Sequence, residues 1–298
     1  MAPAQMHDGQ VGTTTDLVRG LLATQLPHLS DLPIRPVEES GTDHALYRVG
    51  QDLVVRLPIV DWAVEQAERD LRWLPVLAPH LDLAIPVPVA VGRPGEGYPW
   101  PWSVVPWIAG ETPGEDNLDL TAAAVTLAQF VKALHGIPNG GGPVKSGTAR
   151  GVPVHHLDAV VRPLIEELLD EIDASAVTRV WDEAMGAARW DAPPVWIHGD
   201  ISPGNLIVRE RRLVAVIDFG GLGLGDPAPD LAPAWNLLDH RSRAVFHEAV
   251  GYDDATWARA KAWVLAPALQ GLRYYRTSRP DFVAAARHQI GAVLADRT

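Results

Sequence analysis

The sequence predicts an α+β fold with two lobes: a small β-rich lobe over residues 1–106 and a larger helical lobe over residues 107–298. Apolar and polar side chains alternate over residues 45–49, a Gly-Gln-Asp turn occupies residues 50–52 and an apolar run follows over residues 53–57, which is typical of two paired strands. Within residues 119–135, apolar side chains recur at helical spacing and a glycine follows, which is typical of an amphipathic helix. The change of hydrophobic period indicates that strands dominate the first lobe and helices the second.

The composition is that of an ordinary folded chain, and it limits the partners. With 298 residues and 47% hydrophobic content, the chain can form one large domain or two modest ones with a real core. The net charge of −12 argues against nucleic acid and against an anionic membrane as partners, and it is compatible with a cationic ligand. The absence of cysteine excludes disulfides. The sequence shows no secretory signal and no uninterrupted apolar run of about 18 residues, so we expect a cytoplasmic protein.

Other local patterns predict the remaining elements of the first lobe. Apolar residues at helical spacing over 17–26 follow three threonines that can cap a first helix. Residues 63–74 predict a second helix with acidic residues on or near its polar side. Residues 98–111 combine an apolar strand with proline and glycine, as a connection between two lobes requires.

In the second lobe, two apolar runs, 206–208 and 213–217, flank a charged turn and predict a hairpin. If the hairpin is symmetric about the Arg211–Arg212 bond, Asn205 lies directly opposite Asp218. Residues opposed in this way have Cβ atoms about 5 Å apart, so an amide and a carboxylate would converge on one point.

Oxygen ligands of this kind are the ones that Mg²⁺ prefers, and water and phosphate oxygens complete its coordination. We therefore predict that Asn205 and Asp218 hold Mg²⁺. Asp200 lies five residues before Asn205, close enough along the loop to face the same point without being a third ligand.

The spacing His198-x-Asp200-x-x-x-x-Asn205, followed by Asp218-Phe219-Gly220, resembles the catalytic half of the protein-kinase signature, with glycine at 199 where protein kinases carry arginine. Together with the Pro-Gly-Asn at 203–205 and the GDPAPDLA run at 225–232, it resembles the aminoglycoside and macrolide phosphotransferase family. The resemblance extends from about Glu39 onward. It implies a protein-kinase-like fold and transfer of phosphate to hydroxyls of small molecules.

The resemblance implies roles for the residues of the second lobe. Asp200 is the expected catalytic residue, which orients and deprotonates the acceptor hydroxyl. Asn205 and Asp218 match the metal ligands of the family. His198 is expected to brace the loop rather than to titrate in the reaction, and Asp230 is expected to brace the same loop without touching substrate.

In the first lobe, the resemblance implies that Arg56 contacts the nucleotide phosphates. Kinases carry lysine there, and arginine keeps the charge but differs in length and planarity, so the exchange is not conservative. Glu68 on the following helix is expected to pair with Arg56, and Glu65 is the alternative. The loop before the predicted strand pair of residues 45–57 is expected to cover the nucleotide, through Ser40, Gly41 and Thr42.

The apolar segment that contains Val105 and Trp107 is expected to bind the nucleotide base. Exposed backbone groups there can pair with an adenine or guanine edge, so ATP and GTP stay equally open as phosphoryl donors. Trp107 could stack on the base or lie in the core. In the family, the region of the acid-rich helix 157–173 helps to wall the acceptor site. An acidic face there would suit a cationic polyamine or aminoglycoside, and a solvated helix face is the simpler interpretation.

Other functions stay open beside the phosphotransferase. A non-catalytic nucleotide-binding pseudokinase is favoured by Arg56 and disfavoured by the intact Asp200, Asn205 and Asp218. A metal-dependent hydrolase could use His198, Asp200 and Asp218, although the hairpin pairs Asp218 with an amide, a poor zinc ligand. A protein kinase is disfavoured because His-Gly-Asp replaces His-Arg-Asp. The expected acceptor is a small hydroxylated molecule of unknown identity, and the oligomeric state is unknown.

Overall fold

The computed structural model describes residues 9–37, 43–114 and 116–296, and the chain divides into two compact units. Unit 1 consists of Met1–Pro79 and Ala84–Gly110, and unit 2 of His80–Leu83 and Glu111–Thr298. Unit 1 contains the main sheet and unit 2 contains most of the helices, so the predicted α+β class is confirmed.

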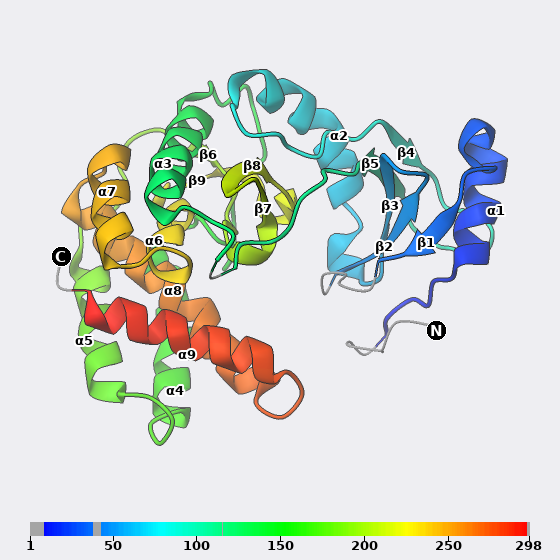
Figure 1. Ribbon diagram of the computed structural model, residues 1–298. Helices are drawn as coiled ribbons and strands as arrows, with labels where there is room; N and C mark the ends of the chain where they lie inside the picture. The colour runs from blue at the N-terminus through cyan, green and yellow to red at the C-terminus, as the bar shows by residue number, and fades with distance from the viewer. Residues whose placement is uncertain (1–8, 38–42, 115, 297–298) are drawn as a thin grey trace. The chain divides into compact units, whose positions relative to one another are not determined.

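Unit 1 is built on a five-stranded antiparallel sheet with the strand order β1-β2-β3-β5-β4 (Figure 1). The predicted strand pair is its β2–β3 hairpin, in which Val49 lies opposite Leu53. Gly50 follows β2 with a φ of 61°, a conformation that glycine adopts without strain. The strands are β1 (Ile34–Pro36), β2 (His44–Val49), β3 (Leu53–Pro58), β4 (Ala90–Gly92) and β5 (Trp102–Pro106).

Two helices complete unit 1. Helix α1 (Thr15–Gln25) begins where the Oγ1 of Thr14 accepts the amide of Leu17 at 3.1 Å, as the threonine cap predicts. The buried apolar face of α1 packs against the sheet. The core that they form includes Val55 and Trp102 of the sheet. Helix α2 spans Gln66–Leu77, three residues later than predicted. Short 3-10 turns lie at Pro27–Leu29, Asp61–Ala63 and Ala78–His80.

Unit 2 is mainly helical. The predicted amphipathic helix is α3 (Leu120–Gly136), whose cap Asp119 accepts the amides of Thr121 and Ala122 at 3.0 Å each. Helix α9 lies alongside α8 (Figure 1). The other helices are α4 (Asp158–Glu167), α5 (Ala174–Gly186), α6 (Pro233–Asn236), α7 (His240–Val250), α8 (Asp254–Tyr275) and α9 (Pro280–Ala295), with 3-10 turns at Val154–Leu157, Pro203–Asn205, Phe219–Gly221 and Ala228–Leu231.

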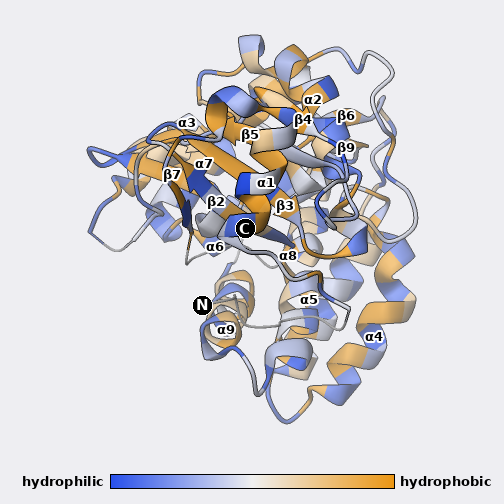
Figure 2. Ribbon diagram, turned by 90° about the vertical axis from the view of Figure 1, so that its right-hand side faces the viewer, coloured by the Kyte–Doolittle hydropathy of each residue, from blue (hydrophilic) through white to orange (hydrophobic). Residues whose placement is uncertain are grey.

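The acid-rich stretch 157–173 is not one helix. Helix α4 ends at Glu167 and a turn follows, in which the amide of Glu171 donates to the carbonyl of Leu168 at 2.8 Å. Asp173 then caps α5. Figure 2 shows α4 with hydrophobic and hydrophilic residues in alternation, as expected for a helix with one buried face. No helix in the described ranges is long and apolar enough to cross a lipid bilayer.

Two small antiparallel pairs complete unit 2: β6 (Val195–Ile197) with β9 (Gly223–Gly225), and β7 (Leu206–Arg209) with β8 (Arg212–Val216). The second pair is the predicted hairpin, but its predicted register is wrong. Arg209 lies opposite Arg212, and the intervening Glu210 and Arg211 have φ angles of 51° and 62°. Two consecutive left-handed residues form the tight turn that suits the twist of a hairpin, so the turn is centred one residue earlier than expected.

An irregularity between Ile207 and Val208 shifts the hairpin register again. As a result, Asn205 faces Ile217, whose amide donates to the Asn205 carbonyl at 2.9 Å. Asp218 therefore follows the paired segment instead of lying directly opposite Asn205.

Candidate active site

The loop of residues 198–205 follows β6 and is held by the buried carboxylate of Asp230. Oδ2 of Asp230 accepts the backbone amide of His198 at 2.8 Å, and Oδ1 accepts that of Gly199 at 2.7 Å. The expected role of Asp230 as a brace for this loop is confirmed. Because both bonds go to main-chain groups, they fix the path of the backbone that carries Asp200.

Asp230 is fully buried, yet its surroundings favour the charged form. Burial by itself raises its pKa, but the hydrogen bond from His135, the nearby His198 and the amide of Gly199 outweigh burial and hold the pKa below its ordinary value. Nε2 of His135 lies 3.1 Å from Oδ2 of Asp230, and its Nδ1 lies 2.7 Å from the hydroxyl of Tyr252. Burial raises the pKa of Tyr252 far above its ordinary value, so this hydroxyl keeps its proton beside His135.

Gly199 explains why this chain has His-Gly-Asp. Its φ is 80°, and a Cβ placed on it would lie 2.9 Å from the carbonyl oxygen of Gly221. Any side chain there would collide with backbone and adopt a strained conformation. The tight approach of the 198–205 loop to residues 219–221 therefore requires glycine at this position.

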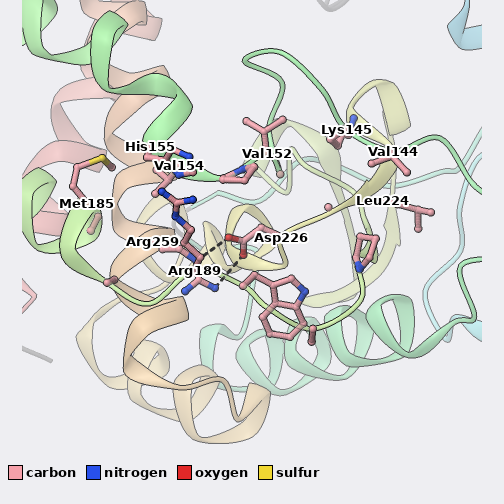
Figure 3. Close-up of a pocket in the computed structure, with 18 residues that line it drawn as sticks. Val144, Lys145, Val152, Val154, His155, Met185, Arg189, Leu224, Asp226 and Arg259 are labelled. Carbon is pink, nitrogen blue, oxygen red and sulfur yellow. Dashed lines mark hydrogen bonds and ion pairs between the residues drawn. The ribbon is translucent and has the colours of Figure 1, made fainter.

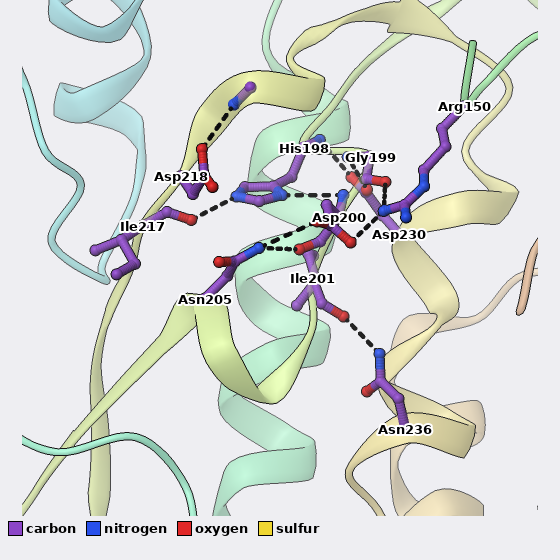
Figure 4. Close-up of polar contacts among 11 residues, drawn as sticks. Arg150, His198, Gly199, Asp200, Ile201, Asn205, Ile217, Asp218, Asp230 and Asn236 are labelled. Atoms are coloured by element: carbon purple, nitrogen blue, oxygen red, sulfur yellow. Dashed lines mark hydrogen bonds and ion pairs between the residues drawn. The ribbon is translucent and has the colours of Figure 1, made fainter. Parts of the chain in front are cut away.

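His198 is buried and both of its ring nitrogens are engaged. Nδ1 accepts the backbone amide of Asp200 at 3.1 Å, so Nε2 carries the proton and donates to the carbonyl of Ile217 at 3.1 Å (Figure 4). The ring thus links the loop to the end of β8. This arrangement agrees with the expected bracing role, and it leaves neither nitrogen for a metal ion.

The carboxylate of Asp200 contacts the guanidinium of Arg150, which also donates to the carbonyl of Gly199 at 2.9 Å (Figure 4). Both side chains are partly exposed, at 36% for Arg150 and 43% for Asp200. Sequence reasoning missed Arg150, because it lies in a loop 50 residues before its partner and belongs to no periodic pattern. The contact orients the carboxylate and partly balances its charge.

Asn205 lies beside Asp200 and has a defined amide orientation. Its Nδ2 donates to the carbonyl of Asp200 at 2.9 Å and to the Asp200 carboxylate at 3.3 Å. The amide oxygen of Asn205 lies on the opposite side of the group, and an oxygen of this kind is a suitable ligand for a hard cation.

Asp218 has a φ of 60°, a left-handed conformation that turns the chain sharply after β8. Its Oδ1 accepts the amide of Gly220 at 3.4 Å. Figure 4 shows Asn205 and Asp218 on either side of the His198 ring. The pair of one carboxylate and one amide oxygen fits the oxygen ligands that Mg²⁺ takes in proteins. Among the described residues, no group of three or more histidine or carboxylate side chains could hold a metal ion, so the hydrolase site is not supported.

In unit 1, Arg56 pairs with Asp70 instead of the expected Glu68. Nη1 of Arg56 lies 3.6 Å from Oδ2 of Asp70, and both side chains are buried. Glu68 and Glu65 are exposed. The cause is helical geometry: the face of α2 toward the sheet contains Ala67, Asp70 and Leu74, which recur at three- and four-residue spacing, and Glu68 lies off that face.

The pairing of β5 with β3 determines which backbone groups near Val105 and Trp107 can contact a ligand. Val105 lies opposite Val54, and the Trp107 amide donates to the Asp52 carbonyl at 2.7 Å, so both residues direct their backbone groups to β3. The guanidinium of Arg48 lies 4.4 Å from the centre of the Trp107 ring and covers one of its faces. The two residues expected to bind the base are thus already engaged within unit 1.

The alternation of an antiparallel strand directs the carbonyl of Pro106 and the amide of Ile108 to the opposite edge. On that edge β4 pairs only with residues 102–104 among the described residues. Beyond Val104, this edge therefore offers the Pro106 carbonyl as an acceptor and the Ile108 amide as a donor.

Asp200 opens into a pocket of about 700 Å³ formed entirely within unit 2. Its walls come from the 198–205 loop and from α6, α8 and α9, and Arg150 lies at its edge. This volume is in the range of pockets that hold a drug-sized molecule. None of its lining residues belongs to 157–173, so the acid-rich stretch does not wall this pocket.

A smaller pocket of about 260 Å³ lies elsewhere in unit 2, among Lys145, His155 and Arg189. Figure 3 shows Asp226 and Arg259 facing each other in its wall, and Nε of Arg259 lies 2.7 Å from Oδ2 of Asp226. Both partners are buried, so this pair is a structural link between β9 and α8.

The sequence matches the model of the phosphotransferase enzyme family over residues 34–263. The chain belongs to this phosphotransferase family. The match begins at β1 and ends within α8, so it covers both the Arg56 strand and the whole 198–230 region.

Within the family, an aminoglycoside 3'-phosphotransferase from Escherichia coli is 36% identical over 116 residues, which are 38% of this chain and 42% of that protein. A homologue from Salmonella typhimurium with the same description is 33% identical over 114 residues. The chain thus matches less than half the length of these curated relatives.

Two solved structures of family members share the fold. The GDP complex of aminoglycoside 2'-phosphotransferase-IIIa aligns with a TM-score of 0.71 at 21% identity, covering 95% of this chain and 99% of that one. Macrolide 2'-phosphotransferase MphH from Brachybacterium faecium aligns with a TM-score of 0.62 at 22% identity, covering 96% and 100%. These alignments confirm the predicted protein-kinase-like fold of the family.

The predicted site residues fall into two groups. Asp200, Asn205 and Asp218 gather in unit 2, around His198 (Figure 4). Arg56 and Val105 belong to the sheet of unit 1, Trp107 directly follows β5, and Glu68 is exposed on α2. The loop residues Ser40, Gly41 and Thr42 lie outside the described residues, and their predicted contact with the nucleotide stays a prediction.

Proposed function

We propose that this protein transfers the γ-phosphoryl group of a nucleoside triphosphate to a hydroxyl group of a small molecule. The observation that supports this most is the position of Asp200. It stands on a loop whose backbone Asp230 holds, it contacts Asn205, and it opens into a pocket large enough for a drug-sized acceptor. Membership of the phosphotransferase family agrees with this reaction.

In the proposed reaction, the acceptor hydroxyl forms a bond to the γ-phosphorus while the bond from that phosphorus to the β,γ-bridging oxygen breaks. The nucleoside diphosphate leaves with the electron pair, and the hydroxyl proton passes to Asp200 and then to solvent. Phosphoryl transfer depends mainly on positioning and on charge neutralisation. Asp200 therefore acts chiefly by aligning the hydroxyl, and Arg150 holds the carboxylate in a fixed orientation.

The carboxylate of Asp218 and the amide oxygen of Asn205 would hold Mg²⁺, which supplies positive charge to the phosphates when bound. The two hydrogen bonds donated by Nδ2 of Asn205 keep its oxygen directed away from Asp200. Asp200 itself stays free of the metal for its contact with the acceptor.

In unit 1, Arg56 would contact the nucleotide phosphates, and Asp70 would fix its side chain. The nucleotide base would pair with the carbonyl of Pro106 and the amide of Ile108, while Val105 and Trp107 contribute side-chain contacts only. This backbone pairing suits either ATP or GTP. The predicted cytoplasmic location stays a prediction from the sequence.

Nucleotide consumption by the purified protein tests the function. We expect diphosphate release from ATP or GTP to depend on Mg²⁺ and to rise when a hydroxylated acceptor is added, and we expect a phosphorylated product by mass spectrometry. Asp200→Asn should lower turnover by about two orders of magnitude or more and leave nucleotide affinity within a few-fold. Nucleotide binding without turnover on any acceptor would instead identify a pseudokinase, which the contact of Asp200 with Arg150 and the arginine at 56 would then explain.

A further inference from the structure

We infer that the pocket next to Asp200 selects a mainly apolar, oxygen-rich alcohol with at most one positive charge, and that it discriminates against polyamines. This inference rests on the proposed function, because it names the acceptor class of the same site. It is drawn from the charges, the apolar surface and the unpaired polar atoms of the pocket wall.

The carboxylates of the pocket wall are already neutralised. Among the lining residues only Asp200 and Asp281 carry carboxylates. Asp200 contacts Arg150, and Asp281 accepts bonds of 2.7 and 3.0 Å from Arg279. His288 is a further basic residue in the wall. A polyamine entering this space would lose hydration at each ammonium and meet no unpaired carboxylate in exchange.

The acid-rich stretch 157–173 offers no substitute, because none of its residues lines the pocket and two of its acids pair with arginines near the C-terminus. Glu167 lies 2.9 Å from Arg273, and Glu171 lies 2.8 Å from Arg276 and 3.0 Å from Arg287. The expectation that this stretch attracts a cationic acceptor is therefore not supported.

The rest of the wall is largely apolar, and its surface suits the carbon skeleton of an acceptor. Trp263 is 4% exposed and lies on the same helix as Val264 and Ala268, and residues of α9 also line the pocket. Large side chains with apolar surface dominate this region, namely Trp263, Val264, Pro267, Tyr275 and Phe282. Burial of apolar ligand surface against them is the main source of affinity that the pocket provides.

Two buried polar atoms of the wall lack hydrogen-bond partners: Nε1 of Trp263 and Oδ1 of Asn236. An indole N–H is only a donor, so an ether, carbonyl or hydroxyl oxygen can satisfy it and an ammonium group cannot. The Nδ2 of Asn236 donates to the carbonyl of Ile201 at 2.9 Å, which orients Oδ1 to accept from a hydroxyl. A ligand that shifts the surrounding side chains slightly and presents oxygen to both atoms removes the cost of leaving them unpaired.

The direct test compares erythromycin, an oxygen-rich macrolide with a single amine, with kanamycin, a polyamine. We expect erythromycin to bind in titration calorimetry and to be phosphorylated with a kcat/KM about a hundredfold or more above that of kanamycin. Phosphorylation of kanamycin in preference to erythromycin, or binding of neither compound, overturns the inference. Erythromycin binding without phosphorylation of any acceptor supports the pocket assignment and contradicts the proposed function, so the two failures can be told apart.

Two pairs of variants test the wall itself. Trp263→Phe removes the N–H and keeps the ring, and we expect erythromycin KM to rise about three- to tenfold with nucleotide KM unchanged. Trp257→Phe is the matched control, because its Nε1 is also buried without a partner but Trp257 does not line the pocket. If Trp263 has only a structural role, both variants change the melting temperature alone and this part of the inference is wrong.

Gln289→Glu adds one carboxylate to the pocket wall with little change of shape. We expect kanamycin to bind about two- to fivefold more tightly to this variant at low salt, and the gain to disappear at high salt. Gln129→Glu, on the exposed side of α3, should show no gain. Equal kanamycin affinity in wild type and Gln289→Glu would show that carboxylates do not limit polyamine binding here.

Discussion

The guanidinium of Arg150 contacts the carboxylate of Asp200, and the same guanidinium donates to the carbonyl of the preceding residue. Both contacts come from Nη1 of Arg150, which therefore links the Asp200 carboxylate to the loop backbone and restricts rotation of the carboxylate and movement of the loop. Arg150 is thus a positioning residue for the proposed catalytic group, contributed by a loop distant in the sequence.

Arg150→Ala should lower kcat about ten- to a hundredfold, because the Asp200 carboxylate then samples orientations that do not align the hydroxyl. Arg150→Lys should restore part of the loss, since it keeps the charge without the length and planar shape of the guanidinium. Steady-state kinetics with nucleotide KM as a second readout checks this, with Arg179→Ala on the exposed side of α5 as control. A faster Arg150→Ala enzyme would show that the contact inhibits instead of positioning.

Asp70→Asn should destabilise unit 1 and raise nucleotide KM. Removing one partner of a buried ion pair costs about 3 kcal/mol or more, since the buried Arg56 charge loses the attraction of the Asp70 carboxylate. Glu68→Gln, on the exposed side of the same helix, should change the free energy of unfolding by less than about 0.5 kcal/mol. Urea denaturation of both variants shows which of the two acids is the partner of Arg56. A larger effect for Glu68→Gln would restore the partner expected from the sequence.

Arg56→Ala should lower kcat/KM strongly, because it removes positive charge from the departing phosphoryl group. Arg56→Lys should be a partial defect, since lysine restores charge but neither the reach nor the planar shape of arginine. Rates on one accepted acceptor, measured for wild type and both variants, test this. A lysine variant faster than wild type contradicts the view that Arg56 is the fitted phosphate ligand.

Asp218→Ala should abolish the dependence of nucleotide binding on Mg²⁺, because it removes the only carboxylate of the proposed metal pair. Calorimetric titration of nucleotide with and without Mg²⁺ measures the difference directly. Asp170→Ala, an exposed carboxylate in unit 2, serves as control. If the metal dependence of Asp218→Ala equals that of wild type, the ligand assignment is wrong.

Asp230 predicts a pH dependence of stability. Its folded-state pKa is held below the ordinary value, so as pH falls the unfolded chain takes up this proton before the folded chain does. Its contribution to the free energy of unfolding is therefore complete above about pH 5 and is lost as pH falls through the unfolded pKa toward the folded one. Asp230→Asn should show a shallower fall in stability between about pH 5 and pH 3 than wild type.

Urea denaturation at a series of pH values measures this slope, with Asp170→Asn expected to keep the slope of wild type. Equal slopes in wild type and Asp230→Asn would show that folding does not lower the pKa of Asp230.

The sequence by itself determined the elements and the residues of the proposed centre. Helical and strand periods are local properties, so α1, α3 and the β2–β3 hairpin could be predicted from a few turns or alternations. The spacing from His198 to Asn205 confines the loop to so few residues that Asp200 and Asn205 must lie close together.

Tertiary structure decided everything that depends on distant partners. The face of α2 that meets the sheet selected Asp70 over Glu68, and left-handed residues at the hairpin turn displaced Asp218 from its predicted position. Arg150 approaches Asp200 from a loop 50 residues away, and arginines far along the chain pair with Glu167 and Glu171 of the acid-rich stretch 157–173. Sequence periodicity cannot predict these contacts, because the sequence shows neither the partner of a charged residue nor its solvent exposure. Both determine the electrostatic energy of the charge.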